Sequence, residues 1–457
     1  VDASGIESDV EVDSLADAVA LTSLSLTASG LNSTLDLGQV GEGDATANLA
    51  ILDTISVTAS NGSTIDFHTA ADAAEGDINT QGDLVSLTIS SDGEGSTVEA
   101  GTVDADGDNI ETVSYTASEG GAIDNAGAEA GMTINYGFDA LTFATSGADS
   151  SIEVDLLQDT GGITASPEAT ITVEADGSGA SIDLDESSLG AVDLDTLTID
   201  VGSLATLTMV EADIIVDDDV GTIDIDLASN STFEGNLNIE AAGIATTLNI
   251  DMGEESEFAA ATDFMTVDIA GGSDSEVGIK TLNVTLATES DTLVDTTSTN
   301  LIVMDDGEGD ATTHLEVGDS ESAGASDIDF YQGSVTITGD NEHTVNVSNV
   351  LDAAELDTAG TESTFGSWTI TTGEGADTIT GGAGADTITS NDGADSIVAG
   401  AGNDIITSGD GADTVLGGDG NDVLTGGNGA DTLGGGAGND SIKLAESVST
   451  ADVVEFS

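Results

Sequence analysis

The 457-residue sequence contains almost no basic residues. It has two lysines, Lys280 and Lys443, and no arginine, against 89 aspartates and glutamates. Proteins that bind DNA or RNA need lysine and arginine to displace the counterions of the phosphates, so this composition excludes nucleic acid as a direct partner. An anionic membrane surface would repel a chain with a formal net charge of −87 for the same reason. Cations are the partners that remain.

Cysteine is absent, proline occurs once, and aromatic residues make up only 3% of the chain. No disulfide can therefore stabilise the fold, and we expect thin, repetitive core layers of Leu, Ile, Val and Ala. The absence of cysteine fits a protein that leaves the cell. No stretch approaches the roughly 18–20 continuous apolar residues of a membrane-spanning helix. A hydrophobic fraction of 38% argues against a disordered chain.

Eight consecutive nine-residue units fill residues 372–443, and in each of them position 4 is Gly, position 6 is Asp and position 8 is aliphatic. The glycines are Gly375, Gly384, Gly393, Gly402, Gly411, Gly420, Gly429 and Gly438, and the aspartates are Asp377, Asp386, Asp395, Asp404, Asp413, Asp422, Asp431 and Asp440. Glycine allows a tight turn that exposes backbone carbonyls, and carboxylates with carbonyls are the ligand set of Ca²⁺, which takes about 6–8 oxygens. One turn offers too few oxygens, so we expect two turns to share each of several Ca²⁺ ions, with these glycines and aspartates as the metal-binding residues.

These units resemble the glycine-rich nonapeptide repeat of RTX proteins, GGxGxDxUx. The resemblance implies a calcium-bound parallel β-roll in which two units form one 18-residue coil, so that odd and even units line opposite edges. Asp377, Asp395, Asp413 and Asp431 would then line one edge and the other four aspartates the opposite one, with roughly six ions between neighbouring turns. Ser390 and Asn391 replace both leading glycines of the third unit, where we expect the weakest site.

A longer repeat occupies much of the remaining chain. The phrase aliphatic-x-x-aliphatic-x-aliphatic recurs at 21–26, 52–57, 84–89, 110–115, 138–143, 194–199 and 220–225, with a degenerate copy at 168–173 that begins with Glu168. The starts are 26 to 32 residues apart. A second phrase, such as STLDL at 33–37, follows each one after a turn rich in Gly, Ser and Asn. Alternation at period two predicts strands, and units of this size must stack to bury a face. We expect a parallel β-solenoid with a variable third segment, such as 214–216; an antiparallel meander of hairpins is the alternative.

The second phrase carries an acidic residue at the same place in seven of eight copies. These residues are Asp36, Asp66, Glu99, Asp124, Glu153, Asp183 and Glu234, and the exception is Thr208. In adjacent coils they would lie about 4.8 Å apart, where two charges repel by roughly 0.9 kcal/mol at bulk dielectric. Two interpretations stay open: a hydrated acidic face, or a row that gathers divalent ions.

Little in the sequence indicates catalysis. His68, His314 and His343 are scattered, and neither HExxH nor GxSxG occurs. Glycoside hydrolysis needs only two carboxylates, but an enzyme acting on acidic polysaccharides would need Lys or Arg to neutralise its substrate. We therefore expect that the protein is not an enzyme, and a polysaccharide-active enzyme is the least favoured function.

The sequence thus predicts an all-β protein with a parallel β-solenoid or β-helix-like body followed by a C-terminal calcium-binding RTX β-roll. The expected division is an N-terminal segment 1–20, a repetitive body 21–260, an irregular β region 261–371 that continues the body, the β-roll 372–443 and a C-terminal tail 444–457.

Within the RTX family the acidic, cysteine-free and lysine-poor composition is most similar to that of bacterial surface-layer (S-layer) proteins. The resemblance implies type I secretion, an extracellular or cell-surface location, and folding that awaits external calcium. We expect a structural protein that self-assembles with calcium into a surface layer or filament. Its partners would be its own copies, with a cell-surface glycan or lipopolysaccharide as a further candidate. The alternative is a secreted adhesin or matrix protein that binds glycans or cells.

Overall fold

The structure is a computed structural model of the whole chain, and the regular elements in the part that it describes are β-strands. The described residues are 1–5, 7–14, 23–39, 53–66, 78–80, 85–99, 103–105, 109–125, 132–134, 137–154, 156–158, 169–184, 188–191, 194–209, 212–216, 220–234, 237–241, 245–253, 257–258, 265–269, 279–286, 302–305, 312–318, 332–337, 342–349, 367–444 and 452–455. Among them there is no helix long and apolar enough to cross a membrane. The chain divides into two compact units, Val1–Val220 with Asn230–Glu240, and Gly221–Ser229 with Ala241–Ser457.

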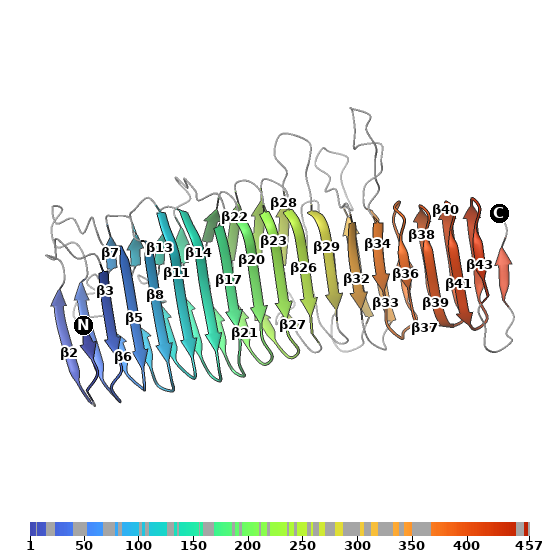
Figure 1. Cartoon of the computed structure of the whole chain (residues 1–457). Helices are drawn as coiled ribbons and strands as arrows, with labels where there is room; N and C mark the ends of the chain where they lie inside the picture. Colours follow the sequence, from blue (N-terminus) through green and yellow to red (C-terminus); the bar gives the residue numbers. More distant parts are fainter. Residues whose placement is uncertain are drawn as a thin grey trace, which may run out of the picture. The chain divides into compact units, whose positions relative to one another are not determined.

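The first unit is built from three parallel sheets, and successive coils contribute strands to each sheet (Figure 1). The first sheet contains β1 (Asp2–Ala3), β3 (Ser23–Ala28), β5 (Thr54–Ser60), β8 (Ser86–Asp92), β11 (Asn109–Ser118), β14 (Gly137–Ser146), β17 (Ala169–Ala175) and β20 (Leu194–Val201). The second sheet contains β2 (Asp9–Ser14), β4 (Thr34–Gln39), β6 (Thr64–Asp66), β9 (Thr97–Glu99), β12 (Ala122–Asn125), β15 (Ser151–Val154), β18 (Ser181–Asp183), β21 (Thr206–Thr208) and β24 (Thr232–Glu234). The third contains β7 (Ile78–Thr80), β10 (Val103–Ala105), β13 (Met132–Ile134), β16 (Leu156–Gln158), β19 (Ser188–Ala191), β22 (Ala212–Val216) and β25 (Leu237–Ala241).

Parallel pairing decides between the two expected arrangements of this unit. Thr54 of β5 pairs with Ser23 of β3 and with Ser86 of β8, and both pairings are parallel. The same holds for the pairings described in the second and third sheets. The parallel β-solenoid is therefore confirmed and the antiparallel meander is wrong. The variable third segment 214–216 lies in β22, inside the third sheet.

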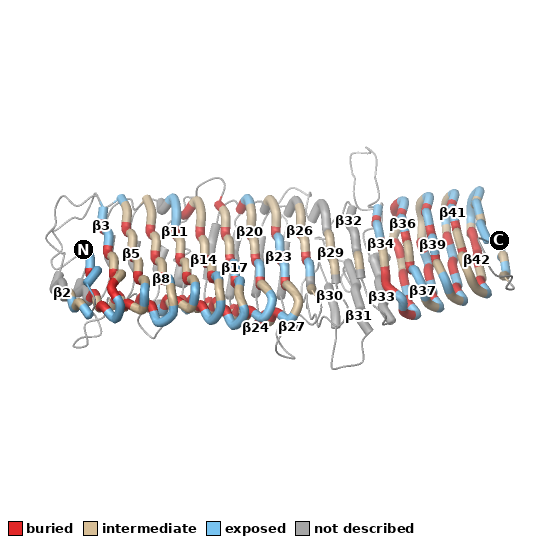
Figure 2. The backbone as a smooth tube through the Cα atoms, turned by 60° about the horizontal axis from the view of Figure 1, so that its bottom comes forward, coloured by how far each residue is buried: buried red, intermediate tan, exposed pale blue. Residues whose placement is uncertain are grey.

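The core of the first unit is a set of columns in which equivalent residues of successive coils lie on one another. In the second sheet the buried column is Leu35, Ile65, Val98, Ile123, Ile152, Ile182, Leu207 and Phe233. Strands such as β5 alternate strictly between buried and half-buried residues, which Figure 2 shows as regular bands. Tyr115 and Phe143 add an aromatic contact, with ring centroids 5.4 Å apart. Leu21, Leu52 and Leu84, which begin three copies of the first phrase, lie outside the described residues.

The polar side chains that are buried at the corner between the first and second sheets carry no charge. In the β5–β6 corner, Asn61 has a φ of 58°, a left-handed conformation that asparagine tolerates well. Ser63 is buried; its hydroxyl donates to the carbonyl of Ser60 at 2.7 Å and accepts from the Ser60 N–H at 3.0 Å. The next coil reinforces this corner, because Ser96 Oγ accepts the N–H of Gly62 at 2.9 Å.

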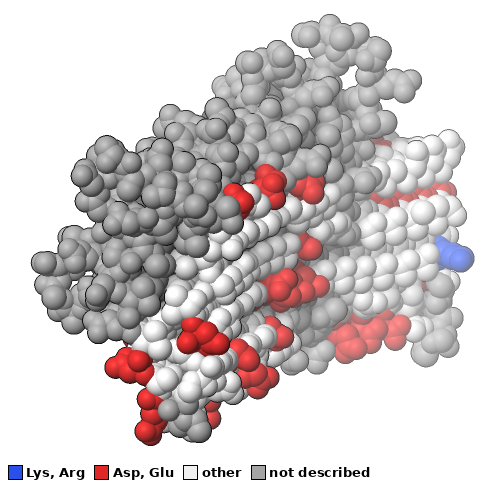
Figure 3. Space-filling model, turned by 60° about the vertical axis from the view of Figure 1, so that its left-hand side comes forward, with Lys and Arg blue, Asp and Glu red and all other residues white. Residues whose placement is uncertain are grey.

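The acidic row of the second phrase lies in register. Asp66 pairs with Glu99, Glu99 with Asp124, Asp124 with Glu153, and Glu153 with Asp183. Figure 3 shows acidic side chains in groups on one face of the molecule. The alignment of the row is confirmed, while its interaction with divalent ions stays a prediction.

The second unit has two main sheets. One contains β23 (Val220–Leu227), β26 (Ala245–Met252), β29 (Ile279–Leu286), β32 (Gln332–Ile337), β34 (Ser367–Thr371), β36 (Thr387–Thr389), β37 (Asp392–Gly393), β39 (Ile405–Gly411), β41 (Val423–Asn428) and β43 (Ser441–Lys443). The other contains β30 (Ile302–Asp305), β31 (Thr312–Gly318), β33 (Glu342–Asn349), β35 (Thr378–Thr380), β38 (Ser396–Ala401), β40 (Thr414–Asp419), β42 (Thr432–Ala437) and β44 (Val453–Glu455). The pair β30–β31 is antiparallel, whereas the other described pairings are parallel. Two further strands are β27 (Glu257–Phe258) and β28 (Met265–Ile269).

In the β-roll, residues 372–443, one coil consists of two nonapeptides. Even-numbered units supply the sheet with β36, β39, β41 and β43, and odd-numbered units supply the sheet with β35, β38, β40 and β42. Partners in neighbouring coils are 18 residues apart, as in Ile379 with Ile397 and Ile388 with Ile406. Position 8 is buried in seven units, from Ile379 to Leu433, so the expected RTX β-roll is confirmed. The finer domain boundaries stay predictions.

Candidate metal centre

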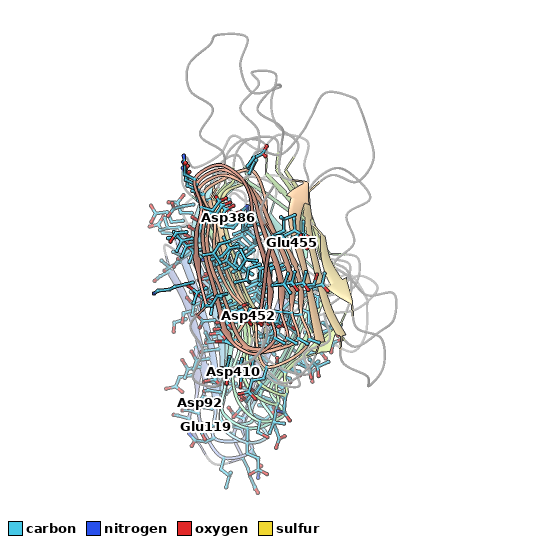
Figure 4. The ribbon with its side chains drawn as sticks, turned by 90° about the vertical axis from the view of Figure 1, so that its right-hand side faces the viewer. Asp92, Glu119, Asp386, Asp410, Asp452 and Glu455 are labelled. Carbon is cyan, nitrogen blue, oxygen red and sulfur yellow. The ribbon has the colours of Figure 1, made fainter. Side chains whose placement is uncertain are left out.

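The aspartates at position 6 form two rows, one at each turn of the β-roll coil. In the odd row, Asp377, Asp395 and Asp413 each donate their backbone N–H to Oδ1 of the aspartate one coil further on, at 2.8, 3.0 and 3.1 Å. In the even row, Asp386, Asp404 and Asp422 do the same, also at 2.8, 3.0 and 3.1 Å. Figure 4 views the coils end-on, with Asp386 of the even row labelled. All eight predicted aspartates thus occupy equivalent positions.

These carboxylates point into the roll. The exposed fraction is at most 2% for each of the seven from Asp377 to Asp431. One oxygen of each carboxylate is used in the row, but the Oδ2 atoms of Asp404 and Asp422 are buried and accept no hydrogen bond. Two lysines and no arginine cannot neutralise eight such groups. A buried carboxylate without a counter-charge costs several kcal/mol, so the arrangement calls for cations from solution.

Burial changes the acidity of the rows. It raises the pKa of Asp386 to about 6 and that of Asp404 to about 6. The hydrogen bonds that these carboxylates accept from backbone N–H groups lower the pKa and offset only part of this effect. Burial also raises the pKa of Asp395, Asp413 and Asp422. In the absence of a cation the roll therefore favours the protonated acids, whereas a bound cation favours the carboxylates.

The glycines at position 4 let successive turns approach one another. Gly402, Gly411 and Gly420 have φ values of 139°, 157° and 146°, which lie in the range that favours glycine. From Gly393 to Gly438, a Cβ at position 4 would lie only 2.5–2.8 Å from the carbonyl carbon of the glycine 18 residues earlier. The backbone of one turn is therefore pressed against the carbonyl group of the previous turn, beside the buried carboxylates.

The third unit keeps its turn without the two leading glycines. Asn391 takes a left-handed φ of 65°, and its amide donates to the carbonyl of Thr372. Ser390 is buried, and its hydroxyl donates to the carbonyl of Ser408 at 2.8 Å. The substitution therefore replaces glycine flexibility with side-chain hydrogen bonds. The expectation that this site is the weakest stays a prediction.

Both rows extend beyond the nonapeptides at one end. Trp368 lies where the even row would have an earlier aspartate, and its backbone N–H donates to Asp386 Oδ1 at 2.8 Å. Asp452 ends the odd row, because its Oδ1 accepts the N–H of Asp431 at 3.2 Å. Neither residue belongs to the nonapeptide pattern that predicts the rows. The letters ADVV at 451–454 match positions 5 to 8 of the repeat and would have revealed Asp452.

The donor set suits a hard, oxygen-seeking cation. Each turn offers buried carboxylate oxygens and closely packed carbonyl groups, which are the ligands that Ca²⁺ takes at about 2.3–2.6 Å. Among the described residues, no three acidic or histidine side chains gather into a group that could hold a metal ion. The glycine spacing predicts a site that combines carboxylates with backbone carbonyls. The residues present fit Ca²⁺.

Stacked 18-residue coils with inward aspartates define a parallel β-roll of the calcium-binding kind. The family model of the RTX calcium-binding nonapeptide repeat (4 copies) matches residues 371–406 and 407–442. Residues 371–442 therefore consist of RTX calcium-binding nonapeptide repeats, and such repeats bind multiple Ca²⁺ ions. No curated protein and no solved structure gives a significant match.

The family match also supports coarser functional statements. RTX-repeat proteins are typically secreted and extracellular, and the repeat segment itself is not catalytic. His68 lies outside the described residues, while His314 and His343 lie in β31 and β33. The individual calcium ligands, the partners and the link to S-layer proteins stay predictions.

Proposed function

We propose that the protein is an extracellular structural protein whose β-roll folds around calcium and whose copies then assemble into a surface layer or filament. The observation that carries the calcium dependence is the pair of buried aspartate rows. In calcium-poor surroundings the carboxylates repel one another and lack counter-ions, and bound calcium supplies free energy for folding. In this proposal the ligands are the position 6 aspartates, together with carbonyls of the glycine-rich turns.

Assembly is favoured by the surface of the folded roll. Each sheet of the roll exposes a pair of aliphatic residues in register: Ile405 with Val423 on one sheet, and Val398 with Leu416 on the other. Their exposed fractions lie between 41% and 52%. Such pairs form only when the coils stack, so they link calcium-dependent folding to contact between copies. Small apolar patches on an acidic protein suit contacts between many copies better than tight binding of one partner.

Electron microscopy and light scattering of the full chain test the proposal. We expect ordered sheets or filaments with millimolar CaCl₂ and dispersed particles after a chelator is added. MgCl₂ at the same ionic strength is the control, because Mg²⁺ demands a smaller octahedral site. The paired variant Ile405→Thr and Val423→Thr should bind calcium normally but assemble less.

Two results would count against assembly. Sheets that persist unchanged in chelator would refute its calcium dependence. Monomers that stay dispersed in calcium but bind purified cell-surface glycan or lipopolysaccharide would instead favour the adhesin alternative.

A further inference from the structure

The odd row of aspartates continues past the last nonapeptide through a strand that the repeat pattern does not include. Strand β44 pairs with β42 in parallel, and Thr432, Leu433 and Gly434 lie opposite Val453, Val454 and Glu455. This register repeats the preceding pairing, in which Thr414, Val415 and Leu416 lie opposite Thr432, Leu433 and Gly434. Val454 therefore takes the place of the position 8 aliphatic residue and Asp452 that of the position 6 aspartate.

The hydrogen bonding supports the same equivalence. Asp431 N–H donates to Asp452 Oδ1 just as Asp413 N–H donates to Asp431 Oδ1, at 3.2 and 3.1 Å. The sequence separation is 21 residues instead of 18. The chain thus places a carboxylate on the next rung although it has departed from the nonapeptide length.

The turn of the seventh unit faces this added rung. Asp431 is 1% exposed, and its Oδ2 lies 2.5 Å from the point that a Cβ on Gly426 would occupy, so this oxygen is directed into the turn. Within the roll, the same relation of Oδ2 to the first glycine of the unit recurs in Gly381 with Asp386. Without a following rung, the seventh turn would have a carboxylate on one side only.

We infer that Asp452 is a ninth aspartate of the calcium-binding rows and that Asp431 and Asp452 flank an additional Ca²⁺ site at the C-terminal end of the odd row. In Figure 4, Asp452 is labelled away from Asp386, toward the other turn of the coil. The odd row then has five aspartates and four intervals, and the even row has four aspartates and three intervals. The expected number of ions rises from roughly six to roughly seven. This inference rests on the proposed role of the rows as calcium ligands.

Three asparagine substitutions in the full chain test it. Asp452→Asn keeps an oxygen that can accept the Asp431 N–H but removes the negative charge. Asp413→Asn makes the same change at an internal rung that flanks two intervals. Asp419→Asn is the matched control, because Asp419 is an exposed carboxylate of the same roll outside both rows. Bound calcium per chain is measured by equilibrium dialysis and atomic absorption at a free calcium concentration that saturates the unaltered protein.

We expect Asp452→Asn to lose about one ion, Asp413→Asn to lose one or two, and Asp419→Asn to lose none. Full stoichiometry in Asp452→Asn together with a loss in Asp413→Asn would overturn the inference and leave the proposed function intact, with Asp452 acting only as a hydrogen-bond acceptor. No loss in either variant would overturn the calcium role of the rows itself.

A second substitution keeps the test decisive if folding suffers. Asp452→Ala removes the acceptor as well as the charge, so we expect it to be less stable than Asp452→Asn while losing the same single ion. Circular dichroism in saturating calcium checks that each variant is folded. Equal stoichiometry in the unaltered protein and in a folded Asp452→Ala variant would refute the additional site.

Discussion

The coils of the first unit and those of the β-roll use similar aliphatic columns but close their corners with different chemistry. In the first unit the buried polar side chains among the described residues are serines and one threonine. Most of these serines, such as Ser63 and Ser96, donate to neighbouring backbone carbonyls, whereas the hydroxyls of Thr145 and Ser231 have no hydrogen-bond partner. In the β-roll the corresponding space holds buried carboxylates such as Asp404 and Asp413. A buried neutral hydroxyl needs no counter-charge, whereas a buried carboxylate needs a cation to offset the cost of its desolvation.

The difference extends to the core. Coils of the first unit bury large side chains such as Tyr115, Phe143 and Phe233, while seven of the eight nonapeptides bury an aliphatic residue at position 8. The hydrophobic effect contributes about 25 cal/mol per Å² of buried apolar surface, so a thin coil gains little from it. We therefore expect the first unit to be stabilised mainly by its core, and the β-roll mainly by calcium.

Removing calcium should give the largest contrast between the two regions. In chelator we expect amide hydrogen exchange in β35–β43 to accelerate by at least about 100-fold, because each ion held at 100 times its Kd contributes about 2.7 kcal/mol. Exchange in strands such as β5, β8 and β11 should change little. Mass spectrometry of the full chain with calcium and with chelator measures both regions in one sample. Equal protection of the roll in the two samples would contradict the comparison.

Changing the pH should affect the stability of the β-roll in opposite directions with and without calcium. The pKa of Asp386 and that of Asp404 are raised to about 6 in the fold, above the value of about 3.9 in an unfolded chain. In chelator these groups therefore stabilise the roll below about pH 4, and that contribution is lost as pH rises through about 6. With calcium the roll should instead be less stable at low pH than at neutral pH, because protons compete with calcium for the carboxylates.

Urea unfolding followed by the emission of Trp368, the single tryptophan, measures this effect. In chelator we expect a higher midpoint at pH 5 than at pH 7, and in calcium a lower one. The same midpoint order with and without calcium would be inconsistent with buried carboxylate ligands.

Replacing a position 4 glycine should damage the roll alone. Gly411 has a φ of 157°, and a Cβ there would lie 2.5 Å from the carbonyl carbon of Gly393. We expect Gly411→Ala to destabilise the roll by about 1–3 kcal/mol in calcium. Gly434→Ala is the matched control, because the nearest atom to its Cβ is a Leu416 methyl 3.3 Å away, which can move. Similar urea midpoints for the two variants would argue against close packing of the turns.

The corresponding test in the first unit removes a buried serine from a corner. Ser63→Ala deletes the hydroxyl that bonds to the carbonyl and N–H of Ser60, and we expect a loss of about 1–3 kcal/mol. The loss should be the same with and without calcium. Ser203→Ala, at an exposed position, serves as control and should change stability by about 0.5 kcal/mol or less. Hydrogen exchange in β5 and β6 provides the measurement, and a calcium-dependent loss would blur the distinction between the regions.

The smallest effect concerns the acidic row of the first unit. Asp124 lies in register with Glu99 and Glu153, so Asp124→Asn should stabilise this unit by about 1 kcal/mol or less at low salt. The gain should vanish in 1 M NaCl, where the Debye length is about 3 Å. Exchange rates of β12 amides in NaCl and CaCl₂ of equal ionic strength give the answer. If CaCl₂ stabilises the unaltered protein more than NaCl does, the acidic row binds divalent ions. Acidic residues of both regions would then interact with cations from solution.

Much of the fold could be predicted because stacked coils require the same residue type at the same position in every coil. The column of Leu24, Ile55, Leu87 and Val113 follows from the spacing of the first phrase, and the two aspartate rows follow from the fixed phase of the nonapeptides. Regular phase is a strong signal because each residue type must satisfy the same neighbours again.

The ends of the aspartate rows could not be predicted in the same way. Trp368 joins the even row through its backbone N–H, which any residue except proline could provide. Asp452 follows a stretch of different length that lacks glycine, so a search for the nonapeptide passes over it. The short strands of the third sheet were also hard to foresee, since little phrase structure marks them.

The two ends of the roll together restrict how its length can change during evolution. Trp368 begins the even row and Asp452 completes the odd row. Inserting or deleting one nonapeptide would shift every later unit to the opposite edge and bring Asp452 to the wrong turn. Inserting or deleting 18 residues preserves both ends. Variation among relatives should therefore proceed by whole coils, which makes the coil, and not the nonapeptide, the unit of inheritance and of engineering.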